Sequence, residues 1–257
     1  MTDTVLWQAA DAAAATNGRA SSDWQAAGVS IDSRTTQPGD LFVAIQGPNF
    51  DGHRFVADAL ARGAVAAMVS ERPDNLAADT PLLRVADTLT GLEALGRAAR
   101  DRCNARIAAV TGSVGKTGTK EALALALARG ALTHASQGNL NNHWGAPLSL
   151  ARMPAASTYG VFELGMNHAG EIAPLSRMVR PHVAIITNVE PVHLEFFSSL
   201  SQIADAKAEI FAGLEPGGVA ILNRDNAHFA HLEAAAKTAG VGRVISFGAH
   251  DRVDARL

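Results

Sequence analysis

A short run of glycines and hydroxyl residues around one lysine carries the clearest chemical signal in the sequence. Residues 111–118 read Thr-Gly-Ser-Val-Gly-Lys-Thr-Gly. Glycines let backbone N–H groups approach a phosphate, and the positive end of a following helix favours the same anion. Lys116 would then reach the β- and γ-phosphates, and the Thr117 hydroxyl would ligate Mg²⁺. We expect a nucleotide-phosphate site that comprises Gly112, Ser113, Val114, Gly115, Lys116, Thr117 and Gly118.

The match to the strict P-loop pattern is incomplete. That pattern has a glycine at the position that Val110 occupies here. An ordinary helix start after a glycine turn is the structural alternative. The strand pattern before the loop and the helix pattern after it favour the phosphate site.

Two further side chains follow strand-like runs and suit a metal site. Glu163 comes directly after the apolar residues 161–162, so its carboxylate would lie beside the loop and hold the metal or its water. His193 follows the next strand and could ligate a metal or position a carboxylate. The alternatives are a solvated glutamate at a strand end and a structural histidine.

Lys207 falls on the apolar side of a predicted helix. It lies four residues after Ile203 and three before Ile210, in the stripe that should be buried. A lysine there is costly unless its charge is paired or neutralised. Either the ammonium reaches past the edge of the core, or Lys207 is a site residue with an altered chemical state.

Strand and helix patterns alternate from residue 106 onward, which is typical of a mostly parallel sheet. Strands are predicted at residues 107–110, 159–162, 183–186, 219–222 and 244–247, and helices at residues 117–129, 171–179 and 201–214. Ligands of such sheets bind at the carboxyl ends of the strands. The loop, Glu163, His193 and Lys207 should therefore share one rim.

The chain is divided by these patterns into residues 1–86, a small α/β unit, residues 87–104, a connecting helix, and residues 105–257. In the first part we expect helices at residues 5–15 and 53–62 and strands at residues 29–32, 41–45, 66–70 and 82–85. Helical spacing of Leu89, Leu92 and Leu95 predicts the connecting helix.

Composition and charge limit the classes of partner. A formal net charge of −3 gives no reason to expect nucleic acid or an anionic membrane. One cysteine, Cys103, cannot form an internal disulfide, and the first residues form no basic leader. We expect a cytoplasmic monomer that acts on small molecules.

The whole set of motifs resembles the Mur ligase family over nearly the entire chain. The loop is similar to that family's own P-loop variant, which also lacks the distant first glycine. The other motifs follow in the family's order: Gly-Asn-Leu-Asn-Asn at 138–142, Glu-Leu-Gly-Met-Asn at 163–167, His-Leu-Glu at 193–195 and Lys-Ala-Glu-Ile-Phe at 207–211. Each piece alone is weak, but the set is specific.

The resemblance implies roles for individual residues. The lysine matching Lys207 is carbamylated by CO₂ in the family, which turns a cation into a carboxylate beside Mg²⁺. Glu163 and His193 match residues of the metal sites. Asn139 and Asn142 lie in the stretch near the γ-phosphate, and which asparagine makes that contact stays open.

The first part resembles the UDP-binding domain of the same ligases. The matching runs are residues 32–34, 38–44 and 47–53. An arginine suits a diphosphate, and a glycine-bounded loop permits close backbone approach. The expected UDP-binding residues are Ser33, Arg34, Gly47, Asp51 and His53. The alternative is a Gly/Asp turn with a surface arginine.

The implied reaction is ATP-driven amide formation, most similar to the family member that joins D-alanyl-D-alanine to a UDP-N-acetylmuramoyl tripeptide through an acyl phosphate. Family members continue past this length, so we expect a truncated central domain and no turnover by the 257 residues alone. The alternatives are a diaminopimelate- or lysine-adding Mur ligase, a folylpolyglutamate synthase-like ligase, a non-catalytic nucleotide- or UDP-sugar-binding module and a generic P-loop phosphotransferase.

Overall fold

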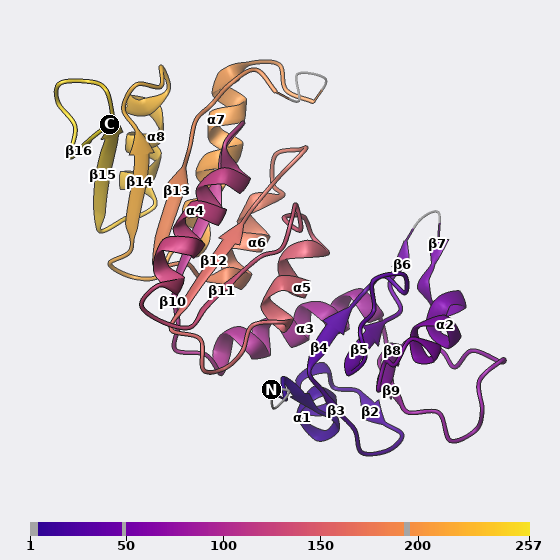
Figure 1. Cartoon of the computed structure of the whole chain (residues 1–257). Coiled ribbons are helices and arrows are strands. Elements are labelled where there is room, and N and C mark those ends of the chain that lie inside the picture. The colour runs from indigo at the N-terminus through magenta and orange to yellow at the C-terminus, as the bar shows by residue number, and fades with distance from the viewer. Residues whose placement is uncertain (1–4, 48–49, 193–195) are drawn as a thin grey trace. The chain divides into compact units, whose positions relative to one another are not determined.

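The computed structural model describes residues 5–47, 50–192 and 196–257. The chain folds into two compact units, which are drawn together in Figure 1. The first comprises Met1–Cys103 and Leu150–Ala155, and the second comprises Asn104–Ser149 and Ala156–Leu257. Among the described residues, no helix is both long enough and apolar enough to cross a membrane.

The second unit is built on a seven-stranded sheet in the order β11-β12-β10-β13-β14-β15-β16. Its strands all pair in parallel. They are β10 (Arg106–Thr111), β11 (Thr133–Ala135), β12 (Tyr159–Glu163), β13 (Val183–Ile186), β14 (Val219–Asn223), β15 (Arg243–Gly248) and β16 (Ala255–Arg256). The parallel α/β architecture predicted from the sequence is confirmed.

Helix α4 (Lys116–Ala128) lies across one face of this sheet (Figure 1). Val110, Val161 and Ile185 form a buried cluster on that face, and Leu123 and Leu127 of the helix pack against it. Because side chains alternate along a strand, the neighbouring residues of each strand face the other side of the sheet. The remaining helices are α5 (Gly145–Ala151), α6 (Ile172–Val179), α7 (Leu200–Ala208) and α8 (Phe229–Thr238).

The predicted helix at residues 201–214 is wrong in its second half. The α-helix ends at Ala208, and a 3₁₀-helix, η2 (Glu209–Gly213), follows. The Ser176 hydroxyl of α6 donates to the carbonyl of Ile210 and accepts from the Gly213 N–H at 3.1 Å. These contacts with α6 replace regular α-helical hydrogen bonds, and the spacing of apolar residues in the sequence does not reveal them.

The first unit contains a five-stranded sheet in the order β2-β9-β8-β5-β4, in which only β2 runs antiparallel. These strands are β2 (Arg19–Ala20), β4 (Gly28–Ser30), β5 (Asp40–Val43), β8 (Ala66–Val69) and β9 (Leu82–Arg84). Two short pairs flank them: β1 (Trp7–Gln8) with β3 (Gln25–Ala26), and β6 (Gln46–Gly47) with β7 (Phe50–Asp51). The parallel strands direct their carboxyl ends to one rim.

Helices α1 (Ala9–Thr16), α2 (Val56–Ala61) and α3 (Thr88–Asp101), with the 3₁₀-helix η1 (Gly52–Phe55), complete the first unit. Helix α3, predicted as a connector at residues 87–104, belongs to the first compact unit. Leu92, Leu95 and Ala99 are fully buried on one side of α3, and the Asp87 carboxylate caps its start. The predicted helix at 5–15 begins only at Ala9, because the two residues before it pair with β3.

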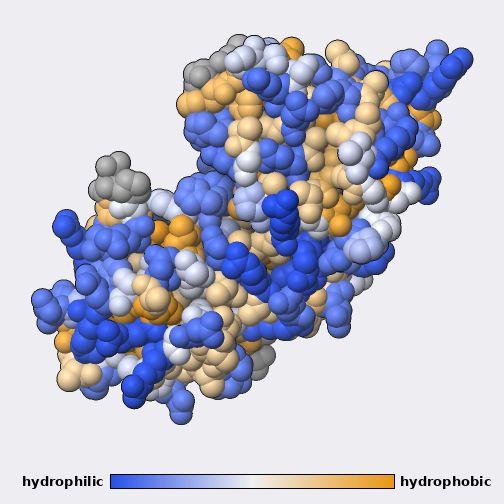
Figure 2. Space-filling model, turned by 180° about the vertical axis from the view of Figure 1, so that it is seen from behind, coloured by the Kyte–Doolittle hydropathy of each residue, from blue (hydrophilic) through white to orange (hydrophobic). Residues whose placement is uncertain are grey.

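Polar and apolar residues are interspersed over the visible face of both units (Figure 2). This mixture agrees with a chain that is 47% hydrophobic and 18% charged. Isolated exposed apolar residues are normal on protein surfaces and need no partner to explain them.

Candidate nucleotide-binding site

The loop between β10 and α4 has a backbone that only glycine adopts easily. Gly112 has φ +150° and Gly115, the residue before α4, has φ +81°. A Cβ atom on Gly112 would lie 1.8 Å from Oγ1 of Thr187. The loop therefore lies directly against the residues that follow β13, and its glycines cannot be exchanged freely.

Side chains fix the loop to the segment that follows β13. The Ser113 hydroxyl donates to the Glu190 carbonyl at 3.0 Å and accepts from the Glu190 N–H at 2.9 Å. The Val114 N–H donates to Oδ1 of Asn188 at 3.0 Å, and the Thr187 hydroxyl donates to the Val114 carbonyl at 2.6 Å. The N–H of Val114, a residue predicted to contact the phosphate, is thus used within the protein.

The first N–H groups of α4 are placed where a phosphate could accept from them. The opening turn of any helix has N–H groups without a carbonyl partner in the helix, and they carry partial positive charge. In α4 these belong to Lys116, Thr117 and Gly118. A phosphate at this point would meet backbone donors that nothing within the helix satisfies.

The Lys116 side chain folds back over the loop. Its ammonium donates to the carbonyls of Gly112 at 2.8 Å and Ser113 at 3.3 Å. Burial lowers the pKa of Lys116, and the negative charge of Glu163 opposes this shift. The ammonium therefore lies over the loop, in the field of the Glu163 carboxylate.

Glu163 is buried at the end of β12, with 2% of its surface exposed. One carboxylate oxygen accepts the Thr117 hydroxyl at 2.8 Å, and the other accepts the Asn141 side-chain amide at 2.7 Å. Its position follows from parallel pairing, since β12 lies next to β10 and both strands end at the same rim. Two oxygen-bearing side chains that suit a hard cation thus lie together beside the phosphate loop.

The three asparagines of residues 139–142 have different surroundings. Asn139 is exposed. Oδ1 of Asn142 accepts the N–H groups of Trp144 at 3.1 Å and Gly145 at 2.9 Å, so it caps α5. Asn141 is the one that contacts Glu163. Asn141 was not among the predicted site residues, because spacing does not tell which asparagine of the run points toward the loop.

Lys207 lies on the buried face of α7, with 2% of its surface exposed. The ammonium therefore does not reach past the core edge as the structural alternative supposed. Burial, and secondarily the positive charge of Lys116, lowers the pKa of Lys207 to about 7. Within the described part of the chain, no hydrogen-bond acceptor or acidic partner contacts its ammonium.

The end of α7 is anchored by Glu209, two residues after Lys207. Its carboxylate accepts the N–H groups of Gly170, Ile172 and Ala173 at the start of α6. A carboxylate at a helix N-terminus satisfies free N–H groups and interacts favourably with the helix dipole. This contact joins η2, which directly follows α7, to the start of α6.

His193, the fourth predicted metal or catalytic residue, lies outside the described residues. Among those that are described, no three His, Cys, Asp or Glu side chains cluster as metal ligands would. The structure thus brings together the loop, Glu163 and Asn141. The charge of Lys116 acts on Lys207.

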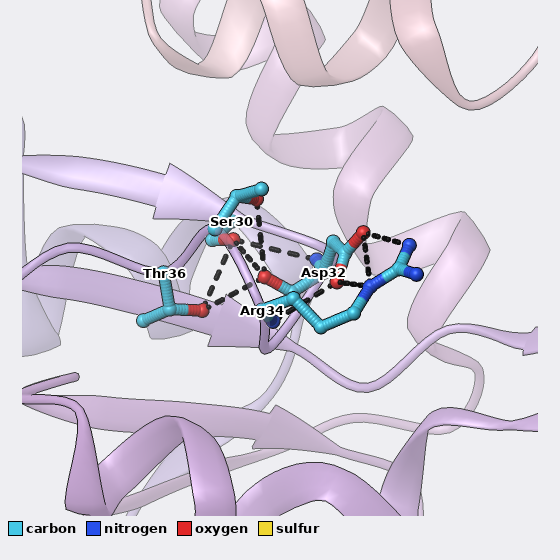
Figure 3. A network of polar contacts seen from close by, with 5 residues as sticks. Ser30, Asp32, Arg34 and Thr36 are labelled. Carbon is cyan, nitrogen blue, oxygen red and sulfur yellow. Dashed lines mark hydrogen bonds and ion pairs between the residues drawn. The ribbon is translucent and has the colours of Figure 1, made fainter.

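In the first unit, Arg34 pairs with a carboxylate of its own turn. Its guanidinium lies 2.6 Å from Asp32, and both side chains are at least partly exposed. Figure 3 shows this pair beside Ser30 and Thr36, whose hydroxyls both contact the Asp32 carbonyl. The hydrogen bond from Arg34 holds the pKa of Asp32 below its usual range, against the effect of burial.

Asp51 and His53 form a second group at the rim. His53 is buried, and its Nε2 accepts the Ser70 N–H at 3.0 Å, so the ring proton is on Nδ1, which donates to Asp51 at 2.6 Å. Burial raises the pKa of Asp51, but the hydrogen bonds from the backbone and ring of His53 lower it by more. The pKa of Asp51 therefore lies below its usual value. No hydrogen bond between described residues joins this group to the Arg34 turn.

The second unit therefore has the form of a P-loop α/β nucleotide-binding domain: a parallel strand, a glycine loop, a helix, and an acidic residue at the end of the neighbouring strand. Two family models match the chain. "Mur ligase middle domain" matches residues 110–256, and "Mur ligase family, catalytic domain" matches residues 25–129. The chain belongs to the Mur ligase family.

Curated relatives and solved structures point to one branch of that family. Proteins named UDP-N-acetylmuramoyl-tripeptide–D-alanyl-D-alanine ligase are 39% identical over 229 residues in Rickettsia prowazekii and 45% identical over 198 residues in Escherichia coli. These matches cover 89% and 77% of this chain but 51% and 43% of the relatives. The chain thus spans about half the length of the curated relatives it matches.

Two crystal structures agree with these relatives. A MurF structure from Acinetobacter baumannii has a TM-score of 0.84 at 37% identity, and the match covers 97% of this chain and 54% of the MurF chain. MurF from Thermotoga maritima, solved in complex with ADP, has a TM-score of 0.70 at 29% identity. That match covers 88% of this chain and 51% of the Thermotoga chain. A diaminopimelate ligase has a TM-score of 0.50 at 21% identity, which shows the shared fold alone.

Proposed function

We propose that this chain supplies the substrate- and ATP-binding part of an ATP-dependent ligase of peptidoglycan synthesis, which joins D-alanyl-D-alanine to a UDP-N-acetylmuramoyl tripeptide. One observation carries the proposal: a P-loop helix whose Thr117 contacts a buried Glu163 that Asn141 also holds. The names of the relatives at 39% and 45% identity support the choice of substrate. We place the reaction in the cytoplasm and expect a monomer.

The residues beside the loop fit a magnesium ion. Mg²⁺ takes oxygen ligands and commonly uses one or two carboxylates, a hydroxyl, water and substrate phosphates. Thr117 and Glu163 supply a hydroxyl and a carboxylate in mutual contact. When bound there, the ion would neutralise charge on the phosphates. We assign His193 to the same site.

Lys207 would add a further oxygen ligand once it is carbamylated. A lysine with a pKa of about 7 is half neutral at pH 7. The neutral amine adds to CO₂, forms an N–C bond and loses one proton, which leaves a carbamate anion. Conversion to an anion removes the repulsion from Lys116 and turns it into attraction.

The chemistry is a phosphoryl transfer followed by an acyl transfer. Lys116 and the N–H groups at the start of α4 stabilise negative charge on the γ-phosphoryl group as it passes to the substrate carboxylate. The amine of D-alanyl-D-alanine attacks the resulting acyl phosphate, and phosphate leaves. No side chain forms a covalent bond to the substrate, so positioning and charge provide the catalysis. Asn139 and Asn142 lie in the stretch assigned to the γ-phosphate.

We assign UDP recognition to residues 1–86 and ATP binding to residues 105–257. In the first part, Arg34 would exchange Asp32 for the diphosphate, while the backbone at Gly47 approaches the ligand. Ser33, Asp51 and His53 complete this assignment. The exposed position of Arg34 supports it, because an arginine whose ion pair is open to solvent can exchange its carboxylate for another anion.

Calorimetry on the 257-residue chain tests the nucleotide half of this proposal. We expect ADP to bind, to bind more tightly with Mg²⁺, and to lose affinity in Lys116→Ala, while UDP-N-acetylmuramoyl tripeptide binds independently of ADP. Absence of ADP binding under all of these conditions would refute the proposal.

An amine panel tests the substrate. In a protein of the relatives' length that contains this chain, ATP-dependent phosphate release should require the UDP-linked tripeptide together with D-alanyl-D-alanine. Release with diaminopimelate, lysine or glutamate instead would assign the chain to another ligase of the same fold. By itself the 257-residue chain should bind ADP and the UDP-linked tripeptide without turnover.

A further inference from the structure

A second buried lysine lies one helical turn after the phosphate loop. Lys120 is fully buried, with 0% of its surface exposed, and is the one buried residue of α4. Its ammonium donates to the carbonyls of Ser136 at 2.7 Å and Gly138 at 3.0 Å, and it lies 2.9 Å from the carboxylate of Glu121. Burying an ammonium is costly, so these acceptors must replace the water that it loses.

The two carbonyls belong to the turn that leaves the sheet after β11. Register pairing of β11 with β12 ends at Ala135, and the Ser136 N–H still donates to the Val161 carbonyl at 3.0 Å, while the carbonyls of Ser136 and Gly138 face the Lys120 ammonium. An apolar side chain at position 120 could fill the same space but could not satisfy these carbonyls. The lysine therefore fixes the path of the turn relative to the helix.

The same turn leads to the proposed metal site by a short series of contacts. The Ser136 hydroxyl accepts the N–H of Glu163 at 3.1 Å. Glu163 in turn accepts Asn141 from the end of the turn and Thr117 from the helix. Lys120 and Thr117 are three residues apart on α4, so helix, turn and strand end form one closed ring of polar contacts.

We propose that Lys120 is a positioning residue that holds residues 136–141 against α4, so that Asn141 and Glu163 meet Thr117 in the arrangement that binds the metal–nucleotide complex. This inference rests on the proposed nucleotide function. Lys120 itself touches none of the reacting groups. Its charge acts through the turn, on the position of the Glu163 carboxylate.

The test compares ADP affinity with and without Mg²⁺ in the 257-residue chain and in Lys120→Met, which keeps an unbranched side chain one atom shorter and removes the charge. We expect the gain in affinity from Mg²⁺ to fall by about tenfold, as for loss of one hydrogen bond to a charged group. Affinity without Mg²⁺ should change less than threefold or so, because the loop and Lys116 are intact. Lys120→Gln serves if the methionine variant does not fold.

A control variant separates positioning from general destabilisation. Leu232→Ala removes a buried side chain of α8, which contributes nothing to the ring, and should lower stability without changing the gain from Mg²⁺. Equal loss of that gain in both variants, or no loss in Lys120→Met, overturns the inference.

Hydrogen exchange distinguishes failure of this inference from failure of the proposed function. Without any ligand, amides of residues 136–145 should exchange about tenfold faster in Lys120→Met than in the parent, while those of residues 219–223 stay unchanged. If the Lys120→Met variant exchanges faster but the parent chain shows no Mg²⁺-dependent ADP binding, Lys120 positions the turn and has no role in binding the metal–nucleotide complex. Unchanged exchange rejects the positioning itself.

Discussion

The hydroxyl of Thr117 donates a 2.8 Å hydrogen bond to the carboxylate of Glu163, 46 residues away in the sequence. Thr117 lies in the first turn of α4, after the glycine loop, and Glu163 ends the neighbouring strand. Parallel pairing of β10 with β12 brings them to one rim of the sheet. The contact joins the helix after the glycine loop to the single buried glutamate of the described chain.

Thr117→Val should weaken the gain in ADP affinity from Mg²⁺ by about tenfold, because it removes an oxygen ligand and frees Glu163 to move. The comparison is Thr119→Val on the same helix, whose hydroxyl makes no hydrogen bond to any described residue. Titration calorimetry with and without Mg²⁺ measures both. Equal effects of the two substitutions would contradict the assignment of Thr117.

Gly112→Ala should destabilise the second unit and abolish ADP binding. The new Cβ would come within 1.8 Å of Thr187, in a backbone conformation that alanine rarely adopts. Gly118→Ala is the matched change, since its Cβ would meet nothing within 4 Å. That variant should raise the free energy of unfolding by about 0.5 kcal/mol, because alanine favours helix. Urea unfolding measures the free energy of unfolding of both variants. A similar loss of stability in Gly112→Ala and Gly118→Ala would refute the prediction.

Lys207 should make stability rise with pH in CO₂-free, metal-free buffer. Its pKa is about 7 in the folded chain against 10.5 ordinarily, so the unfolded chain binds more protons between these values. The destabilising effect is complete below pH 7 and disappears as the pH rises to 10.5. Lys207→Met should therefore stabilise the chain by on the order of 3 kcal/mol at pH 6 and progressively less toward pH 10. A constant difference between pH 6 and pH 10 would show that Lys207 does not titrate in this way.

Arg34→Ala should reduce the affinity for a UDP-linked substrate by about tenfold, since arginine binds a diphosphate through several donors. Stability should not change measurably, because both side chains of the Asp32 pair are solvent-accessible. The pKa of Asp32 should move up toward its usual range, which carboxyl NMR detects. Arg62→Ala, an exposed arginine of the same unit, is the control, and an equal loss of affinity there would leave Arg34 without a special role.

Local sequence patterns determined the elements of the second unit. Short apolar runs predicted five of its strands within one residue at each end, because each of these strands lies between two others in the parallel sheet. The glycine loop was also visible in the sequence, since its backbone conformation requires glycine at 112 and 115. Lys207 could be recognised because a cation in an apolar stripe violates the pattern around it.

The partners of these residues were decided only in three dimensions. Asn141 could not be distinguished from Asn139 and Asn142, since a turn obeys no period that tells which side chain faces the loop. Lys120 looked like an ordinary polar residue of an exposed helix, because its acceptors are backbone carbonyls, which any sequence supplies. Hydrogen bonds to backbone depend on where strands end and turns begin, and the packing of the whole sheet sets those positions.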